Sequence, residues 1–316
     1  MMKASRFSLA DLLTLLAALA FGFICFLGLN FVTEGDLLIS ILIAVGIVLI
    51  LGGLALMAKL QKTVRKDFKT HIIVEFSLVV VFTILFFGVS YLVFPHFFTV
   101  SSKKDQIKES LLSSIGGATK MFDDYETYAK NRESIYEANL NSVVAAKKTR
   151  PTDYSDYGFG ADGISDNVQI ENKLFTLHAD LFPTNYSDTV SRRGTKDVAT
   201  KWLNEQRSTV SQWKPIGIPI VANELAAKAS EWRSELIGYS KIREKGEIAQ
   251  DFSYELSFGD VSPLLTEMES PKSLPIILSV ALWALMLFSW LITKRDTRFP
   301  GFKRVFGRDK VLDNEL

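Results

Sequence analysis

Apolar residues gather in four long blocks along the chain, and most charged residues fall between them. The blocks run over residues 9–32, 37–58, 72–94 and 274–292. A helix needs about 20 residues to cross a bilayer, whereas an apolar run of about 10–14 residues is more typical of a buried core helix. The pattern therefore predicts four transmembrane helices, the fourth of them over residues 274–293.

The first block has two features of a signal peptide. Lys3 and Arg6 precede it, and Ala18-Leu19-Ala20 imitates a cleavage site. The apolar run nevertheless continues to Val32 without a polar stretch where a mature chain would begin. We therefore expect an uncleaved anchor, with Cys25 packed at mid-membrane.

Basic residues of the short segments predict the orientation. The N-terminal tail, the loop 59–71 and the tail 294–316 carry 14 Lys and Arg, whereas the loop 33–36 has none. Short cytoplasmic loops are enriched in Lys and Arg, and long translocated segments count little. We expect both termini in the cytoplasm and residues 95–273 outside it; the inverted topology puts every short basic segment on the wrong side.

The exported segment, residues 95–273, has 22 basic and 26 acidic residues and no cysteine. Exported eukaryotic domains of this size usually carry disulfides, so the composition favours a bacterial inner membrane and a periplasmic domain. Periodic apolar positions predict helices over 105–148, 165–181, 187–213 and 222–249, with a short break around Pro95 before the first. A loop is expected over 150–163, extended chain over 215–220 and a short strand over 252–258. The predicted fold class is membrane α, with four transmembrane helices plus a mostly helical exported domain with minor β structure.

Small residues recur every fourth position in the first block, at Ala10, Thr14, Ala18 and Gly22. That spacing makes a shallow row on one helix face, against which a second helix can pack closely. The partner helix could belong to the same chain, to a second protomer or to another membrane subunit. The four-residue loop 33–36 requires the first two helices to form a tight antiparallel hairpin.

Ionisable residues inside the blocks are few. Asp11 and Glu75 both lie within a turn of the predicted cytoplasmic boundary, where Lys69 or His71 can balance the charge of Glu75. Ion and proton paths need polar groups at mid-depth, and transporters usually have interrupted helices. The blocks have no charged residue at mid-depth, only hydroxyls such as Ser40, Thr83 and Ser279, and we expect no interrupted helix, which argues against transport.

The basic C-terminal tail interleaves cations with phenylalanines. Two interpretations remain open: binding of anionic headgroups, and docking of a cytoplasmic partner with the phenylalanines as anchors. The loop 59–71 is a second basic segment on the same predicted side. The candidate docking residues are Lys294, Arg295, Arg298, Phe299, Phe302, Lys303, Arg304 and Phe306.

Signatures of chemistry are missing from the sequence. There is one cysteine, no phosphate-binding glycine loop and no paired histidines at helical spacing. The acidic cluster at Asp123, Asp124 and Glu126 is typical of a solvated helix face, and His178 stands alone. A net charge of +1 argues against a nucleic-acid partner. We therefore predict a non-enzymatic protein without metal or cofactor.

The layout of three clustered membrane helices, one exported domain and one returning helix resembles the TssN family, membrane components of type VI secretion systems with an alternative membrane complex. The resemblance covers the whole chain and rests on architecture. It implies a multi-subunit complex that spans the periplasm and anchors a cytoplasmic baseplate. We expect a structural subunit in a homo- or hetero-oligomer, with the bilayer and other membrane and periplasmic proteins as partners. The alternative is a periplasmic sensor that signals through a separate cytoplasmic protein.

Overall fold

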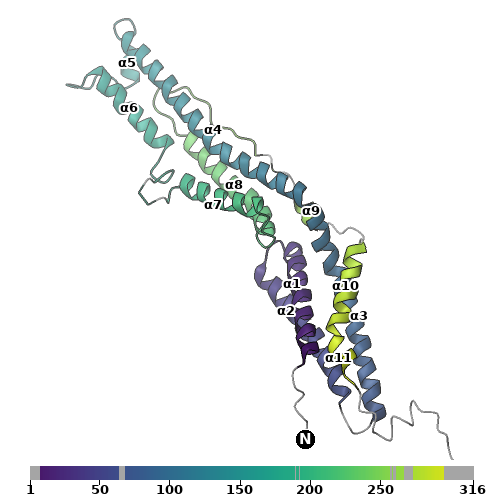
Figure 1. Cartoon of the computed structure of the whole chain (residues 1–316). Coiled ribbons are helices and arrows are strands. Elements are labelled where there is room, and N and C mark those ends of the chain that lie inside the picture. Colours follow the sequence, from purple (N-terminus) through teal and green to yellow (C-terminus); the bar gives the residue numbers. More distant parts are fainter. Residues whose placement is uncertain are drawn as a thin grey trace, which may run out of the picture. The chain divides into compact units, whose positions relative to one another are not determined.

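A computed structural model describes residues 8–63, 68–188, 190–191, 193–256, 258, 261–266 and 273–294. Over these residues the chain forms helices and no strand (Figure 1). It divides into two compact units, which are described separately. The apolar unit combines residues up to Lys104 with those from Ser262 onward, and the helical unit consists of Asp105–Val261.

Three helices of the apolar unit are long and apolar enough to cross a membrane, and they indicate a multi-pass membrane protein. They are α1 (Leu9–Val32), α2 (Leu37–Gln61) and α3 (Phe68–Ser102). The predicted hairpin joins the first two. The Asp36 carboxylate caps α2 by accepting a 3.0 Å hydrogen bond from the Ile39 N–H, and Gly35 takes a φ of 92° that few other residues adopt.

The predicted break at Pro95 is absent, because α3 continues through this residue to Ser102. Proline lacks the N–H that would bond the preceding turn, but packing can hold a membrane helix together across it. Here the residues around the proline are buried, and Phe94 and Val100 are almost fully covered. Tertiary packing therefore keeps α3 continuous at a position where local propensity predicted the end of a helix.

The predicted fourth membrane helix is divided into α10 (Ser273–Met286) and α11 (Phe288–Ile292), after the short helix α9 (Ser262–Thr266). The Thr14 hydroxyl of α1 donates to the Leu285 carbonyl and accepts from the Ser289 N–H, both at 3.2 Å. In an unbroken α-helix that N–H and that carbonyl would bond each other. The inserted side chain thus explains the break between the two helices.

The core of the apolar unit is aromatic. Phe21 of α1 stacks on Phe86 of α3 with ring centroids 4.5 Å apart, and Cys25 is buried beside them. Gly22 lies against α2 so closely that a Cβ atom there would come within 2.5 Å of a Val48 methyl group. The face of α3 that carries Phe82, Phe86 and Phe94 therefore packs within the unit.

The helical unit is built on the long helix α4 (Lys104–Ala145), with α6 (Asp166–Leu181) packed along it through a core that includes Tyr136, Leu140 and Leu177. These helices agree closely with the predicted ranges 105–148 and 165–181. The Ser165 side chain caps α6, as its position before the apolar pattern suggests. The other helices are α5 (Pro151–Asp156), α7 (Thr195–Ser211) and α8 (Ile218–Ser240).

Three boundaries in the helical unit differ from the predictions. The loop 150–163 contains α5. The third helix starts at Thr195 instead of residue 187, because the Asp188 carboxylate accepts from the Val190 and Ser191 N–H groups at 2.9 Å and holds a turn. The fourth helix starts at Ile218 and ends at Ser240, so the prediction of extended chain through residue 220 is wrong. Pro219 lies in the first turn of α8, where no N–H is needed.

The strand predicted over 252–258 is absent from the described residues of that stretch, which pair with no second strand. Its alternating residues instead pack on α4: the buried Phe252 ring lies edge-on to Tyr125, with centroids 5.2 Å apart. The Tyr254 hydroxyl donates to the Gly117 carbonyl at 3.0 Å. Alternating apolar and polar residues indicate that one face of the segment is buried, and here the surface of helix α4 buries it.

A buried ion pair holds the segment after α8 against α4. Arg132 and Glu247 each have side chains only 2% exposed. The guanidinium donates to both Glu247 oxygens, one of them at 2.7 Å, and to the Ser240 carbonyl at 2.8 Å. Burial is the largest single effect and lowers the pKa of Arg132, but the hydrogen bonds to Glu247 and Tyr128 and the charge of Glu247 together outweigh it and raise the pKa overall. We call this pair the latch.

Candidate functional site

Charged and polar side chains gather at one end of the apolar unit, where α1 and α11 lie beside the last turn of α2 and the first turns of α3. Asp11 of α1 belongs to this cluster. Its Oδ2 accepts 2.9 Å hydrogen bonds from the N–H and the hydroxyl of Ser8. Ser8 in turn caps the Asp11 N–H at 3.3 Å. The capping box places a carboxylate in the first turn of α1, where the helix dipole stabilises it.

The other Asp11 oxygen joins three helices. Its Oδ1 accepts from the Lys59 ammonium of α2 and from the Ser289 hydroxyl of α11. The two charged side chains are 13% and 17% exposed, so both are largely withdrawn from solvent. Charges within membrane helices are costly unless they are paired, and this pairing lets them lie between the helices.

Trp290 of α11 links the same end to α2 and α3. Its indole Nε1 donates to Glu75 at 2.8 Å, and the Glu75 residue is 1% exposed. The Lys62 ammonium lies 4.2 Å from the centre of the Trp290 ring and donates to the Trp290 carbonyl at 2.5 Å. His71, which we expected to balance Glu75, instead contacts Gln61 at 2.5 Å, and the side chain of Lys69 lies outside the described part.

A cavity of about 490 Å³ opens beside this polar cluster, between α1, α2 and the α10–α11 pair. Its polar end is lined by Asp11, Lys59 and Ser289, and Trp290 also lines the wall. The rest of the wall is apolar, from Leu15 and Ala18 on α1 to Leu49, Gly52, Gly53 and Leu56 on α2. The cavity is therefore amphipathic, with charge at one end and hydrocarbon along its length.

The predicted packing row lies within the apolar unit. Gly22 contacts α2, Thr14 bonds to the α10–α11 pair, Ala18 is buried at the cavity wall and Ala10 is half-buried.

Of the predicted docking residues, Lys294 is described and exposed. The others, Arg295, Arg298, Phe299, Phe302, Lys303, Arg304 and Phe306, lie outside the described residues.

The pairing of Asp11 with Lys59 and Ser289, and of Glu75 with Trp290, was not predicted from the sequence. A signal was available, since all of these residues fall within about a turn of the same predicted membrane boundary. What the pattern could not provide was the rotation of each helix, which decides whether a charged residue points to lipid, to solvent or to a neighbour.

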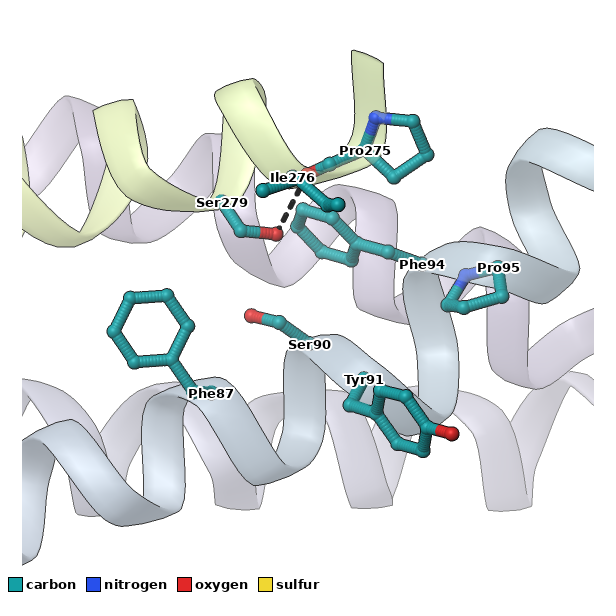
Figure 2. Close-up of a pocket in the computed structure, with 8 residues that line it drawn as sticks. All are labelled: Phe87, Ser90, Tyr91, Phe94, Pro95, Pro275, Ile276 and Ser279. Carbon is teal, nitrogen blue, oxygen red and sulfur yellow. Dashed lines mark hydrogen bonds between the residues drawn. The ribbon is translucent and has the colours of Figure 1, made fainter. Parts of the chain in front are cut away.

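A second, smaller cavity of about 190 Å³ lies between α3 and α10, and Figure 2 shows the eight residues that line it. Its wall is mostly apolar. The Ser279 hydroxyl donates to the Pro275 carbonyl at 2.8 Å, whereas the buried Ser90 hydroxyl has no hydrogen-bond partner among the described residues (Figure 2). Pro95, inside α3, and Pro275, in the first turn of α10, both line it.

The helical unit has an exposed apolar row along α6. Val168 and Phe175 lie on the face of α6 opposite to the buried Ile170, Leu177 and Leu181, and Ile164, just before the helix, is exposed as well. Phe175 is 73% exposed. Exposed acidic Glu171 flanks the row. An apolar helix row that the unit leaves uncovered is typical of an interaction surface.

A groove of about 700 Å³ runs between α4 and residues 247–250 of the helical unit. The latch forms part of its wall, together with Tyr128, Ile135 and Tyr136. Burial, with the nearby carboxylates Glu244 and Glu247, raises the pKa of Tyr136 to about 12, so its hydroxyl stays protonated at neutral pH. The wall of the groove thus combines the ion pair with tyrosine, amide and apolar side chains.

Comparisons with known proteins give no relative. No family model, curated protein or solved structure matches the chain. Among the described residues, no group of three or more His, Cys, Asp or Glu side chains could hold a metal ion.

Proposed function

We propose that the chain is a non-enzymatic anchoring subunit of an envelope-spanning assembly in a bacterial inner membrane. In this proposal both termini are cytoplasmic and residues 95–273 are periplasmic. The asymmetry of basic residues among the short segments supports this orientation. The α10–α11 pair returns the chain to the cytoplasm.

The fourth crossing is supported by geometry. From Ser273 to Ile292 the α10–α11 pair has about the 20 residues that a bilayer crossing needs. At the break between its helices the Thr14 hydroxyl bonds both the Leu285 carbonyl and the Ser289 N–H, so neither of these two backbone groups is left unpaired. Irregular backbone is tolerated at membrane depth when protein groups satisfy it.

The observation that carries the proposal is the exposed row on α6. Its spacing fits an amphipathic helix of a partner protein, which would cover Val168 and Phe175 with its own apolar face. Asp166 pairs with Lys147, His178 contacts Glu133 and Lys173 lies over the Phe159 ring, while Glu171 is exposed beside the row. A partner helix with basic flanks therefore complements this surface.

The test is cross-linking in native membranes with a photoreactive residue in place of Phe175, and with one in place of the exposed Thr176 as the matched control. We expect Phe175 to cross-link to a helical segment with basic flanks, and Thr176 to give several-fold less product. The partner should also be lost from Phe175→Glu and retained by Thr176→Glu. Equal cross-linking at both positions would remove the observation on which the proposal rests.

The assembly that we propose is a secretion-type membrane complex with a second, cytoplasmic partner at the loop 59–71 and the tail 294–316. The resemblance of the layout to the TssN family supports this choice. Replacing Phe299, Phe302 and Phe306 together by Ala keeps every basic residue, so topology should not change. We expect the cytoplasmic partner to be lost, and unchanged recovery of it would eliminate the docking tail.

The groove on α4 favours a second candidate function, a periplasmic sensor. Its volume of about 700 Å³ lies within the range of small-molecule sites, and its wall combines apolar and hydroxyl groups. A sensor predicts a small ligand that raises the thermal midpoint of the full-length protein. Ile135→Trp should block that effect by filling the groove, whereas Phe175→Ala should leave it unchanged.

A further inference from the structure

The amphipathic cavity beside Asp11 and Lys59 has the dimensions of one membrane leaflet. Its wall on α2 runs from Leu60 and Lys59 at the polar end to Leu49 and Val48. At 1.5 Å per residue the distance from Lys59 to Leu49 is about 15 Å, which is about half the hydrocarbon thickness of a bilayer. The cavity thus begins at a membrane face and ends near mid-depth.

The polar end has unused donors. The Lys59 ammonium has three N–H groups, and Asp11 is its one acceptor among the residues that the structure describes. Asp11 itself accepts from four donors, on Ser8, Lys59 and Ser289, so its oxygens are fully engaged. Two N–H groups of Lys59 therefore remain for a ligand in the cavity.

The donors that remain at this end suit an anion. They belong to Lys59, whereas the Lys62 ammonium is engaged by the Trp290 and Thr293 carbonyls and does not line the cavity. Glu75 bonds to Trp290 and does not line the cavity. An ammonium group binds a phosphate strongly because the hydrogen bond is charge-assisted.

The apolar wall has space for a chain. Gly52 and Gly53 face the cavity, and a Cβ atom added at either would meet no atom within 4 Å. Trp290, at the polar end, suits the boundary between headgroup and hydrocarbon. Because the surrounding medium of α1 and α2 is lipid, the natural occupant combines an anionic headgroup with an acyl chain.

We propose that this cavity is a specific site for one anionic glycerophospholipid, whose phosphodiester accepts hydrogen bonds from Lys59 and whose acyl chain lies along Gly52 and Gly53. The lipid would fill the space between α2 and the α10–α11 pair and join the two in the membrane. The site needs only that these helices lie in a membrane, and it is independent of the assembly and the orientation proposed above.

The experiment is native mass spectrometry of the full-length protein in mild detergent, titrated with dioleoyl phosphatidylglycerol or with dioleoylglycerol. We expect one tightly bound phosphatidylglycerol and no comparable binding of the uncharged lipid. Lys59→Gln should weaken that binding about tenfold, the size of one charge-assisted hydrogen bond, while Lys59→Arg should retain it. Circular dichroism checks that each variant is folded.

A second variant leaves the Asp11–Lys59 pair intact. Gly53→Leu should fill the apolar part of the cavity and abolish the bound lipid. Gly46→Leu is its matched control, since Gly46 also lies on α2 with open space around it but does not line the cavity. Equal lipid binding by the Gly53 and Gly46 variants, or binding of dioleoylglycerol as tight as that of phosphatidylglycerol, would overturn the proposal.

Discussion

Removing the carboxylate of the latch is the sharpest test of how the helical unit is held together. In Glu247→Ala the Arg132 guanidinium stays buried, but it loses two hydrogen bonds and its opposite charge. The Glu244 N–H, which donates to Glu247 Oε2 at 3.0 Å, loses its acceptor as well. The Ser240 and Ile242 carbonyls remain as acceptors for Arg132.

The magnitude follows from the burial of both partners. Each side chain of the latch is 2% exposed, so solvent cannot replace the lost partner without opening the segment. Breaking a buried pair in this way costs about 3–5 kcal/mol, of which each charge-assisted hydrogen bond represents about 1.5–3 kcal/mol. Replacing both partners, in Arg132→Met with Glu247→Leu, leaves no isolated charge and should cost less than Glu247→Ala alone.

Hydrogen exchange of the full-length protein in detergent measures the effect where it occurs. Residues 240–252 should open more easily in Glu247→Ala, and a loss of 3 kcal/mol corresponds to an increase in opening of roughly a hundredfold. Glu244→Ala is the matched control, because its side chain makes no ion pair among the described residues. Exchange in Glu247→Ala that stays within threefold of the Glu244 variant would refute the reasoning.

Three further predictions concern other contacts. Gly22→Ala should lower the thermal midpoint in detergent by forcing α1 and α2 apart, at about 1–3 kcal/mol, whereas Gly46→Ala in open space should not lower it. Thr14→Val should cost about 1–3 kcal/mol because it leaves two backbone groups at the α10–α11 break without their partner; a midpoint equal to that of the native protein would contradict the bridge. Hydrogen bonds from Lys147 and Tyr154 lower the pKa of Asp166, so this carboxylate stabilises the fold above its unfolded pKa and the contribution is lost as pH falls through the folded pKa. The difference in unfolding between native protein and Asp166→Asn, measured in urea, should therefore shrink from pH 6 to about pH 3, and a constant difference would disprove the link.

The sequence predicted the elements that depend on local pattern. Helices α1 and α2 follow from apolar runs long enough to cross a bilayer, and α1 has the predicted ends. Helix α6 follows from its period and from Ser165 as its cap. The candidate site was partly predictable: Asp11 and Glu75 were recognised as ionisable residues near a membrane boundary, but their partners were not.

The failed predictions share a cause. Pro95 was expected to break a helix, and the alternation at 252–258 was expected to form a strand. In both places the outcome depends on what packs against the segment: buried neighbours keep α3 continuous, and Tyr125 of α4 provides the face that Phe252 covers. A pattern of period two states that one face is buried, but it does not say by which kind of element.

By itself, the sequence determined that this protein has membrane-length helices and a separate, mostly helical unit, because apolar runs and helical periods are properties of consecutive residues. The tertiary structure alone decided that Thr14 enters the hydrogen-bond ladder of a helix about 270 residues away, that Lys59 meets Asp11, and that Glu247 meets Arg132. Pairings of this kind depend on the rotation and depth of each helix. Rotation and depth follow from the packing of the whole unit, and they produce no periodic pattern in the sequence.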